Sequence, residues 1–246
     1  MEKREIKSYV IRSGRMGKGS KVAMSELLPK YGLSYPADYL KIEELSQEYE
    51  KILIEIGFGM GEALVVMAKN NSSFCYIGLE VHPPGLGRVL RELEDNKITN
   101  VRILPYNAQE AVRTMIPEAF ADGFHIFFPD PWPKQRHHKR RLLQKNFLEL
   151  LVKKVKPGGY IYIVTDWKDY AESIIKLSEE FKDLENSGNP YIQKKEWRPE
   201  TSFELKAKAK KNPVFELFFI KKAPVNPPLI KHYKNITMHK ITKGRG

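Results

Sequence analysis

A short apolar run that ends in alternating glycines constrains the fold of this chain more than any other feature. Residues 51–56 are apolar enough for a buried strand, and Gly57, Gly59 and Gly61 follow within the next five positions. The segment 62–70 then has a helical pattern. A strand, a glycine-rich loop and a helix in this order are typical of nucleoside-cofactor sites, because glycine lets a ligand approach the backbone closely. We therefore expect an open α/β sheet built around this loop.

The alternation of apolar strands and helical segments continues along the chain. The predicted strands are 51–56, 74–79, 101–104, 124–128 and 160–165. The predicted helices are 62–70, 86–93, 108–116, 142–155 and 168–182. Strands that alternate with helices predict a parallel sheet that is covered on both faces. A turn is expected at 156–159, directly before the fifth strand. One further strand is expected near the end of the domain, at 214–220.

Composition divides the chain into three parts. Residues 1–50 are a basic arm with a weakly helical, proline-punctuated lead-in, residues 51–222 are the α/β domain, and residues 223–246 are a basic tail rich in Pro and Lys. Cys75 is the only cysteine, so no internal disulfide is possible, and no spacing of zinc ligands is present. Without an apolar signal segment or a membrane-spanning stretch, the expected location is the cytoplasm, with no metal and no membrane partner.

The basic residues are excessive and clustered. The net charge is +12, which favours a polyanionic partner over a small metabolite. Basic residues without any acid occupy a central run, namely Lys134, Arg136, Lys139, Arg140, Arg141 and Lys145. The tail adds Lys222, Lys231, Lys234, Lys240, Lys243 and Arg245, and the N-terminal arm adds Arg4, Lys7, Arg12, Arg15, Lys18 and Lys21. None of these segments is an amphipathic helix with a broad apolar face, so the pattern favours a nucleic acid over a membrane.

Acidic residues around the glycine loop indicate which cofactor it binds. Glu80 ends the second strand, where a carboxylate accepts hydrogen bonds from ribose hydroxyls. A dinucleotide fingerprint needs Gly or Ala at its sixth position, but this chain has Glu62 there, and Glu55 precedes the loop. These acids oppose a pyrophosphate and attract the ammonium and sulfonium of S-adenosylmethionine. Asn107, after the third strand, is a candidate for the adenine edge or a simple turn residue.

The acceptor site is predicted where the fourth strand ends, in the segment 127–134 (FFPDPWPK). Asp130 lies between two prolines that stiffen the turn, and the basic run begins at Lys134. Adenine-amine methyltransferases have two prolines between Asp or Asn and the aromatic residue, and this chain has only one before Trp132. That difference favours guanine N7, which carries a lone pair and no proton, so no general base is needed. Asp130 is expected to hold guanine N1–H and N2–H and so to align N7 with the methyl group.

These motifs resemble the bacterial tRNA (guanine-N7)-methyltransferase family, which acts on guanine 46 of the variable loop. The resemblance covers roughly residues 50–220, and its most specific part is the segment 127–134 with the basic residues 136–141 behind it. Weaker matches are 12–15, 55–61, 78–82, 165–167 and 201–204. The family usually has Asp where this chain has Asn107. The implied fold is a Rossmann-like class I methyltransferase fold, a mostly parallel seven-stranded sheet with helices on both faces.

The resemblance also implies roles for individual residues. Asp130 is the implied catalytic residue. The implied cofactor-binding residues are Glu55, Gly57, Gly59, Glu80, Asn107 and Asp130. The implied substrate- and RNA-binding residues are Lys134, Arg136, Lys139, Arg140, Arg141, Asp166, Thr201, Ser202, Phe203 and Glu204.

Other interpretations of the same residues remain open at this stage. Thr201 and Glu204 also fit a capping box that begins a helix, and Asp166 fits a helix cap. Among functions, the alternatives are methylation of a different RNA base, a non-catalytic RNA-binding protein on the same scaffold and, more weakly, an NAD-dependent enzyme. The combination of Glu55, Glu80 and Asp130 favours the enzyme, since a binding module does not need all three.

Overall fold

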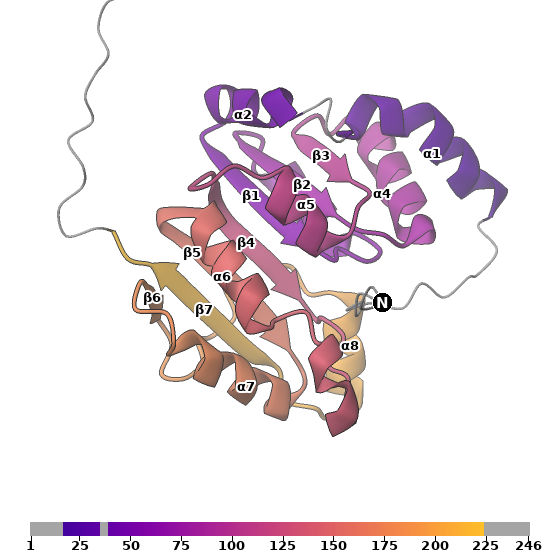
Figure 1. The fold of residues 1–246 in the computed structure, drawn as a ribbon. Coiled ribbons are helices and arrows are strands. Elements are labelled where there is room, and N and C mark those ends of the chain that lie inside the picture. Colours follow the sequence, from indigo (N-terminus) through magenta and orange to yellow (C-terminus); the bar gives the residue numbers. More distant parts are fainter. Residues whose placement is uncertain (1–16, 35–38, 224–246) are drawn as a thin grey trace, which may run out of the picture.

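Seven strands form one sheet in the computed structural model, which describes residues 17–34 and 39–223. Their order is β3-β2-β1-β4-β5-β7-β6 (Figure 1). The strands are β1 (Lys51–Ile56), β2 (Phe74–Leu79), β3 (Val101–Leu104), β4 (Ala121–Phe127), β5 (Val155–Thr165), β6 (Leu184–Asn186) and β7 (Phe215–Lys221). β1 to β5 are parallel, and β7 runs antiparallel to both β5 and β6. The mostly parallel seven-stranded sheet expected from the resemblance is confirmed.

The helices cover both faces of the sheet (Figure 1). They are α1 (Lys18–Tyr31), α2 (Tyr39–Glu48), α3 (Glu62–Asn70), α4 (Pro83–Asp95), α5 (Ala108–Thr114), α6 (Lys145–Lys154), α7 (Lys168–Ser178) and α8 (Ser202–Ala209). One core cluster joins the sheet to α2, α5, α6 and α7, and the other joins it to α1, α3 and α4. Alternate residues of β1 enter different clusters, since Ile52 and Ile54 pack on one face and Leu53 packs on the other.

The lead-in before β1 is better ordered than its proline-punctuated sequence indicates. α1 continues through Pro29 and packs on α4. A Cβ atom at Gly87 would lie 2.6 Å from Ser20 Cβ, so glycine is what allows the two helices to approach so closely. The Tyr31 hydroxyl also donates to Glu94 Oε2 of α4 at 2.8 Å. The described part of the lead-in is therefore packed against the domain.

Several boundaries differ from the predicted ones. β4 begins earlier than predicted, at Ala121, and β5 includes the expected turn, because Val155 pairs with Ala121 before the register shifts at Gly123. The short strand β6 and the 3₁₀ helix η1 (Gln135–Arg140) were not predicted. In the described part of the chain, no helix is long and apolar enough to cross a membrane. The basic arm through Arg15 and the tail from residue 224 lie outside the described residues.

Candidate active site

A cavity of about 240 Å³ opens at the carboxyl ends of β1, β2 and β4. Ile56, Leu79 and Phe127 are the last residues of these strands, and all three line it. The strand order reverses at β1, because β2 and β3 lie on one side of it and β4 lies on the other. Ligands of open α/β sheets bind at such a reversal point, so this cavity is the candidate active site. Its other lining residues are Gly57, Gly59, Glu80, Val81, His82, Tyr106, Ala108, Phe128, Pro129, Asp130, Leu142 and Phe203.

The glycine loop has the conformation that its sequence predicts. Gly57, Gly59 and Gly61 all have positive φ, at 72°, 58° and 77°. Side-chain-bearing residues rarely adopt this region, so the loop needs glycine at these positions. A Cβ atom at Gly61 would also lie 2.0 Å from Val89 Cγ2 of α4. The loop is therefore held close to α4 and exposes bare backbone to the cavity.

Glu80 lies beside this loop and is fixed by backbone donors. Its Oε2 accepts from the Gly59 N–H at 2.8 Å, and its Oε1 accepts from the Val81 and His82 N–H groups at 2.7 and 2.9 Å. A carboxylate offers about four lone-pair positions, so three backbone bonds leave room for a further donor. Glu80 lines the cavity and fits the role of ribose acceptor.

Glu55 lies directly behind the loop and is 3% exposed. Its Oε2 has no hydrogen-bond partner among the described residues. Burial, with a smaller contribution from the charge of Glu80, raises the pKa of Glu55 to about 8. Glu55 lines a second, smaller cavity together with Glu62, Thr201 and Ser202. A buried acid with one oxygen that lacks a donor fits a cationic ligand group, and the ammonium of S-adenosylmethionine is such a group.

Asn107 behaves as a turn residue. It is the N-cap of α5, and its Oδ1 accepts from the Gln109 and Glu110 N–H groups at 2.8 and 3.3 Å. Tyr106 and Ala108 on either side of it line the cavity, whereas Asn107 does not. The carbonyl oxygen that was expected to accept from the adenine amine is therefore occupied by the helix cap.

Asp130 lies in a turn with two unusual backbone positions. Phe128 and Trp132 have φ values of 51° and 45°, a region that costs a non-glycine residue about 1–3 kcal/mol. The Phe128 N–H donates to Val164 O of β5 at 2.7 Å and ties the turn to the sheet. Asp130 is exposed, and it lines the cavity together with Phe128 and Pro129, which precede it after the end of β4. This strained turn places a carboxylate at the mouth of the site.

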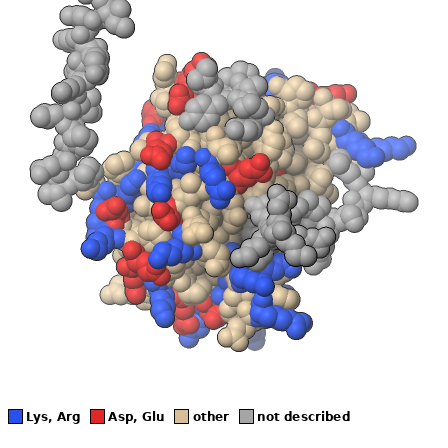
Figure 2. All heavy atoms as spheres, in the orientation of Figure 1, with Lys and Arg blue, Asp and Glu red and all other residues tan. Residues whose placement is uncertain are grey.

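The basic run includes η1 and the residues on either side of it, and its side chains differ in exposure. Lys134, Arg136 and Lys139 are exposed. Burial is the main cause that lowers the pKa of His137, and the positive charges of Arg136, Arg140, Lys134 and Lys139 lower it further. These four cations therefore lie close to His137 and to one another. Figure 2 shows Lys and Arg side chains at the lower right edge, around the position of α8 in Figure 1.

Arg141 differs from the exposed cations of the basic run because it is buried. It is 4% exposed, and its Nε donates to Pro131 O at 2.9 Å. Its Nη2 pairs with Asp169 Oδ2 at 2.5 Å, and its guanidinium lies over the Tyr170 ring. Arg141 therefore supports the Asp130 turn from inside the protein.

The Thr201–Glu204 stretch begins α8 beside the cavity. Thr201 is the N-cap, and its Oγ1 accepts from the Glu204 N–H at 3.3 Å. The Ser202 N–H donates to Glu62 Oε2 at 2.6 Å, which joins α8 to the start of α3. Of the predicted capping box, only the bond from the Glu204 N–H to the Thr201 side chain is thus present.

Asp166 does not cap α7, because Trp167 is the N-cap of that helix. Asp166 Oδ2 instead accepts from Asn212 Nδ2 at 3.3 Å.

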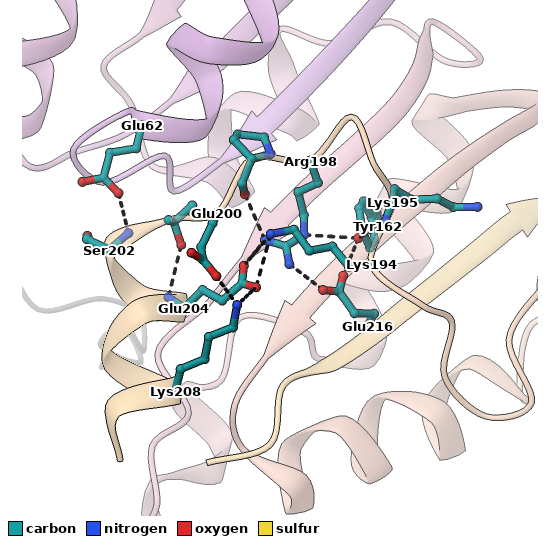
Figure 3. A network of polar contacts seen from close by, with 12 residues as sticks. Glu62, Tyr162, Lys194, Lys195, Arg198, Glu200, Ser202, Glu204, Lys208 and Glu216 are labelled. Atoms are coloured by element: carbon teal, nitrogen blue, oxygen red, sulfur yellow. Dashed lines mark hydrogen bonds and ion pairs between the residues drawn. The ribbon is translucent and has the colours of Figure 1, made fainter. Parts of the chain in front are cut away.

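Glu204, which the family resemblance assigns to the substrate, is buried. Its side chain is 4% exposed, and Oε2 lies 2.8 Å from Arg198 Nη1. Arg198 Nη2 lies 2.5 Å from Glu216 Oε1 of β7, and Arg198 Nε donates to the Tyr162 hydroxyl at 3.2 Å (Figure 3). Glu204 is therefore part of a buried ion-pair network. The sequence analysis missed Arg198, since only its long-range partners distinguish it from other arginines.

This sheet, its glycine loop, the flanking acids and the Asp130 turn define a Rossmann-like class I S-adenosylmethionine-dependent methyltransferase. A family model described as putative methyltransferase matches residues 49–217. A tRNA (guanine-N(7)-)-methyltransferase of Nitrosospira multiformis is 40% identical over 219 residues, 89% of this chain and 96% of that protein. One of Thiobacillus denitrificans is 42% identical over 214 residues, 87% of this chain and 94% of that protein. The chain belongs to the tRNA (guanine-N7)-methyltransferase family.

Solved structures agree with this fold. The 16S rRNA methyltransferase KamB superposes with a TM-score of 0.57 and 16% identity, covering 74% of this chain and 93% of that one. The antibiotic-resistance methyltransferase Kmr superposes with a TM-score of 0.55 and 13% identity, covering 78% and 95%. At this identity the likeness concerns the fold alone.

Proposed function

We propose that this chain transfers the methyl group of S-adenosylmethionine to N7 of guanine 46 in the variable loop of tRNA. The family relatives carry the name of this activity and match nearly the whole of their own length. The observation that carries the proposal is that one cavity brings together the glycine loop, Glu80 and Asp130. A tRNA substrate is also in keeping with the cytoplasm as the place of action.

The residues around the cavity divide the work between cofactor and acceptor. When bound, S-adenosylmethionine supplies an electrophilic methyl group. Glu80 holds the ribose hydroxyls, and Glu55 accepts the ammonium, for which its orphaned Oε2 is the natural partner. Asp130 accepts from guanine N1–H and N2–H and so turns N7 inward. Because N7 carries no proton, alignment and exclusion of water are the main tasks of the protein.

The exposed cations of η1 bind the RNA backbone in this proposal. Lys134, Arg136 and Lys139 are exposed, and they follow directly on the Asp130 turn. Phosphate contacts of this kind position a nucleic acid without reading its sequence. The guanine is then selected by the site itself.

The proposal is tested with the full chain, unmodified tRNA and radiolabelled S-adenosylmethionine. Borohydride and aniline cleave RNA at N7-methylguanine, and we expect cleavage at the variable-loop guanine. Label without that cleavage would indicate a different base. Salt-sensitive tRNA binding without label would indicate an RNA-binding protein on this scaffold.

A further inference from the structure

Two phenylalanines from distant parts of the sequence face each other where the two cavities meet. Phe128 follows β4, and Phe203 lies in the first turn of α8. Their ring centroids are 6.2 Å apart and the ring planes differ by 17°. Both rings line the main cavity and the smaller one. The pair therefore forms an aromatic wall next to Asp130.

Phe203 is unusual because it is apolar and yet 51% exposed. The buried residues of α8 are Glu204 and Ala207, so Phe203 does not belong to the face that packs on the domain. A centroid separation of 6.2 Å is near the upper end of the range of about 4.5–7 Å for aromatic pairs. Much of the ring surface thus remains available to a planar ligand.

The structure holds both rings in place. Phe128 has a φ of 51°, and its N–H is bonded to Val164 O of β5. The first turn of α8 is fixed by two contacts (Figure 3). The Ser202 N–H donates to Glu62, and Glu204 forms a buried ion pair with Arg198. A strained backbone position that the surroundings maintain is a common feature of binding sites.

We propose that Phe203, backed by Phe128, is the surface on which the ring of the acceptor guanine stacks. The family resemblance already assigns Phe203 to the substrate. This inference rests on the proposed function and adds to it the stacking contact that orients the base. Stacking fixes the plane of the purine, and Asp130, which lines the same cavity, then holds its Watson–Crick edge. Lys206 Nζ lies over the Phe203 ring, 5.4 Å from its centroid, so a cation that can pair with a phosphate adjoins this surface.

The alternative is that Phe203 is only an apolar wall of the cofactor cavity. The ring also lies near the glycine loop, since a Cβ atom at Gly59 would be 3.8 Å from Phe203 Cε2. Substitutions distinguish the two roles, because leucine preserves the apolar bulk and removes the planar π face. Tyrosine and tryptophan preserve that face.

The experiment compares Phe203→Tyr, Phe203→Trp, Phe203→Leu and Phe203→Ala in the full chain by kcat/KM for tRNA. We expect Tyr and Trp to remain close to wild type, and Leu and Ala to lose about 5- to 150-fold, the range for loss of one base–aromatic stack. The Kd for S-adenosylmethionine should change much less than kcat/KM. Leu205→Ala is the matched control, because Leu205 is 54% exposed on the same helix and lines neither cavity.

A binding measurement gives a readout that does not depend on methyl transfer. The tryptophan fluorescence of Phe203→Trp, after subtraction of wild type, should be quenched by tRNA with guanine at position 46 and unchanged by tRNA that is abasic there. Equal activity of the Leu and Tyr variants, or equal quenching by both tRNAs, would overturn the stacking role. Failure of the wild-type protein to methylate tRNA would instead overturn the proposed function.

Discussion

Arg198 and Glu204 form a buried ion pair, with Arg198 Nη1 2.8 Å from Glu204 Oε2 and both side chains at most 4% exposed. Glu216 completes the network from β7. The pair fixes the first turn of α8, and this turn brings Phe203 to the cavity. Glu204, a carboxylate that the family resemblance assigns to the substrate, thus also holds the start of α8 in place.

Replacing Arg198 with Met should destabilise the fold by about 3–5 kcal/mol, because Glu216 would remain buried without its cation and Glu204 would keep only its ion pairs with Lys194 and Lys208. Urea unfolding measures this loss. Lys208→Ala is the control, since Lys208 reaches Glu204 and Glu200 from the surface, where ion pairs contribute little to stability. Equal stability of the two variants would contradict the role of the network.

Glu55 should make the stability of the free protein depend on pH. Folding raises the pKa of Glu55 from 4.5 to about 8, so the protonated carboxyl is the stabilising form. The contribution of Glu55 to the free energy of unfolding is fully present below pH 4.5 and is lost as the pH rises through about 8. Between pH 6 and pH 8 the free energy of unfolding should therefore fall by about 2 kcal/mol.

Urea unfolding of wild type and Glu55→Gln at pH 6 and pH 8 tests this dependence. The glutamine variant should show the smaller decrease, because its amide does not titrate. Glu149→Gln serves as the control, since Glu149 pairs with Lys153 on the surface of α6. An identical slope in wild type and Glu55→Gln would contradict the buried, protonated state.

The exposed and buried arginines of the basic run should respond differently to substitution. Arg136→Ala with Lys139→Ala should weaken tRNA binding and reduce the salt slope by about 0.7–0.9 for each phosphate that is no longer neutralised. Arg141→Met should chiefly reduce stability, because Arg141 is bonded to Pro131 O and Asp169 inside the protein. Binding titrations over a range of salt measure both slopes. An unchanged slope in the double variant would place the RNA elsewhere.

Asp130→Ala should reduce methyl transfer by at least about 100-fold in single-turnover reactions, because the base would no longer form two hydrogen bonds to a charged group. The Kd for tRNA should be largely unchanged, since the cations that bind the phosphates are untouched. Near-normal turnover would refute the role of Asp130. Thermal unfolding of the variant checks that the strained turn still forms.

Much of the fold could be predicted from the sequence, because strand and helix periodicities are local. Glu55 and Glu80 were identifiable for the same reason, since each lies at or near the end of a strand beside the loop. Arg141 could not be separated from Arg140 next to it, because the 3₁₀ turn of η1 decides which side chain points inward. Arg198 depends on pairing with Glu216, an interaction between distant parts of the sequence that no spacing reveals.

A tRNA that carries 7-deazaguanosine at position 46 tests the central claim most directly. This base keeps the N1–H and N2–H donors that Asp130 is proposed to hold, and it has carbon where N7 would be. We expect binding close to that of the unmodified tRNA and no transfer of label from S-adenosylmethionine. Transfer of label to the 7-deaza tRNA at the normal rate would contradict methylation at guanine N7.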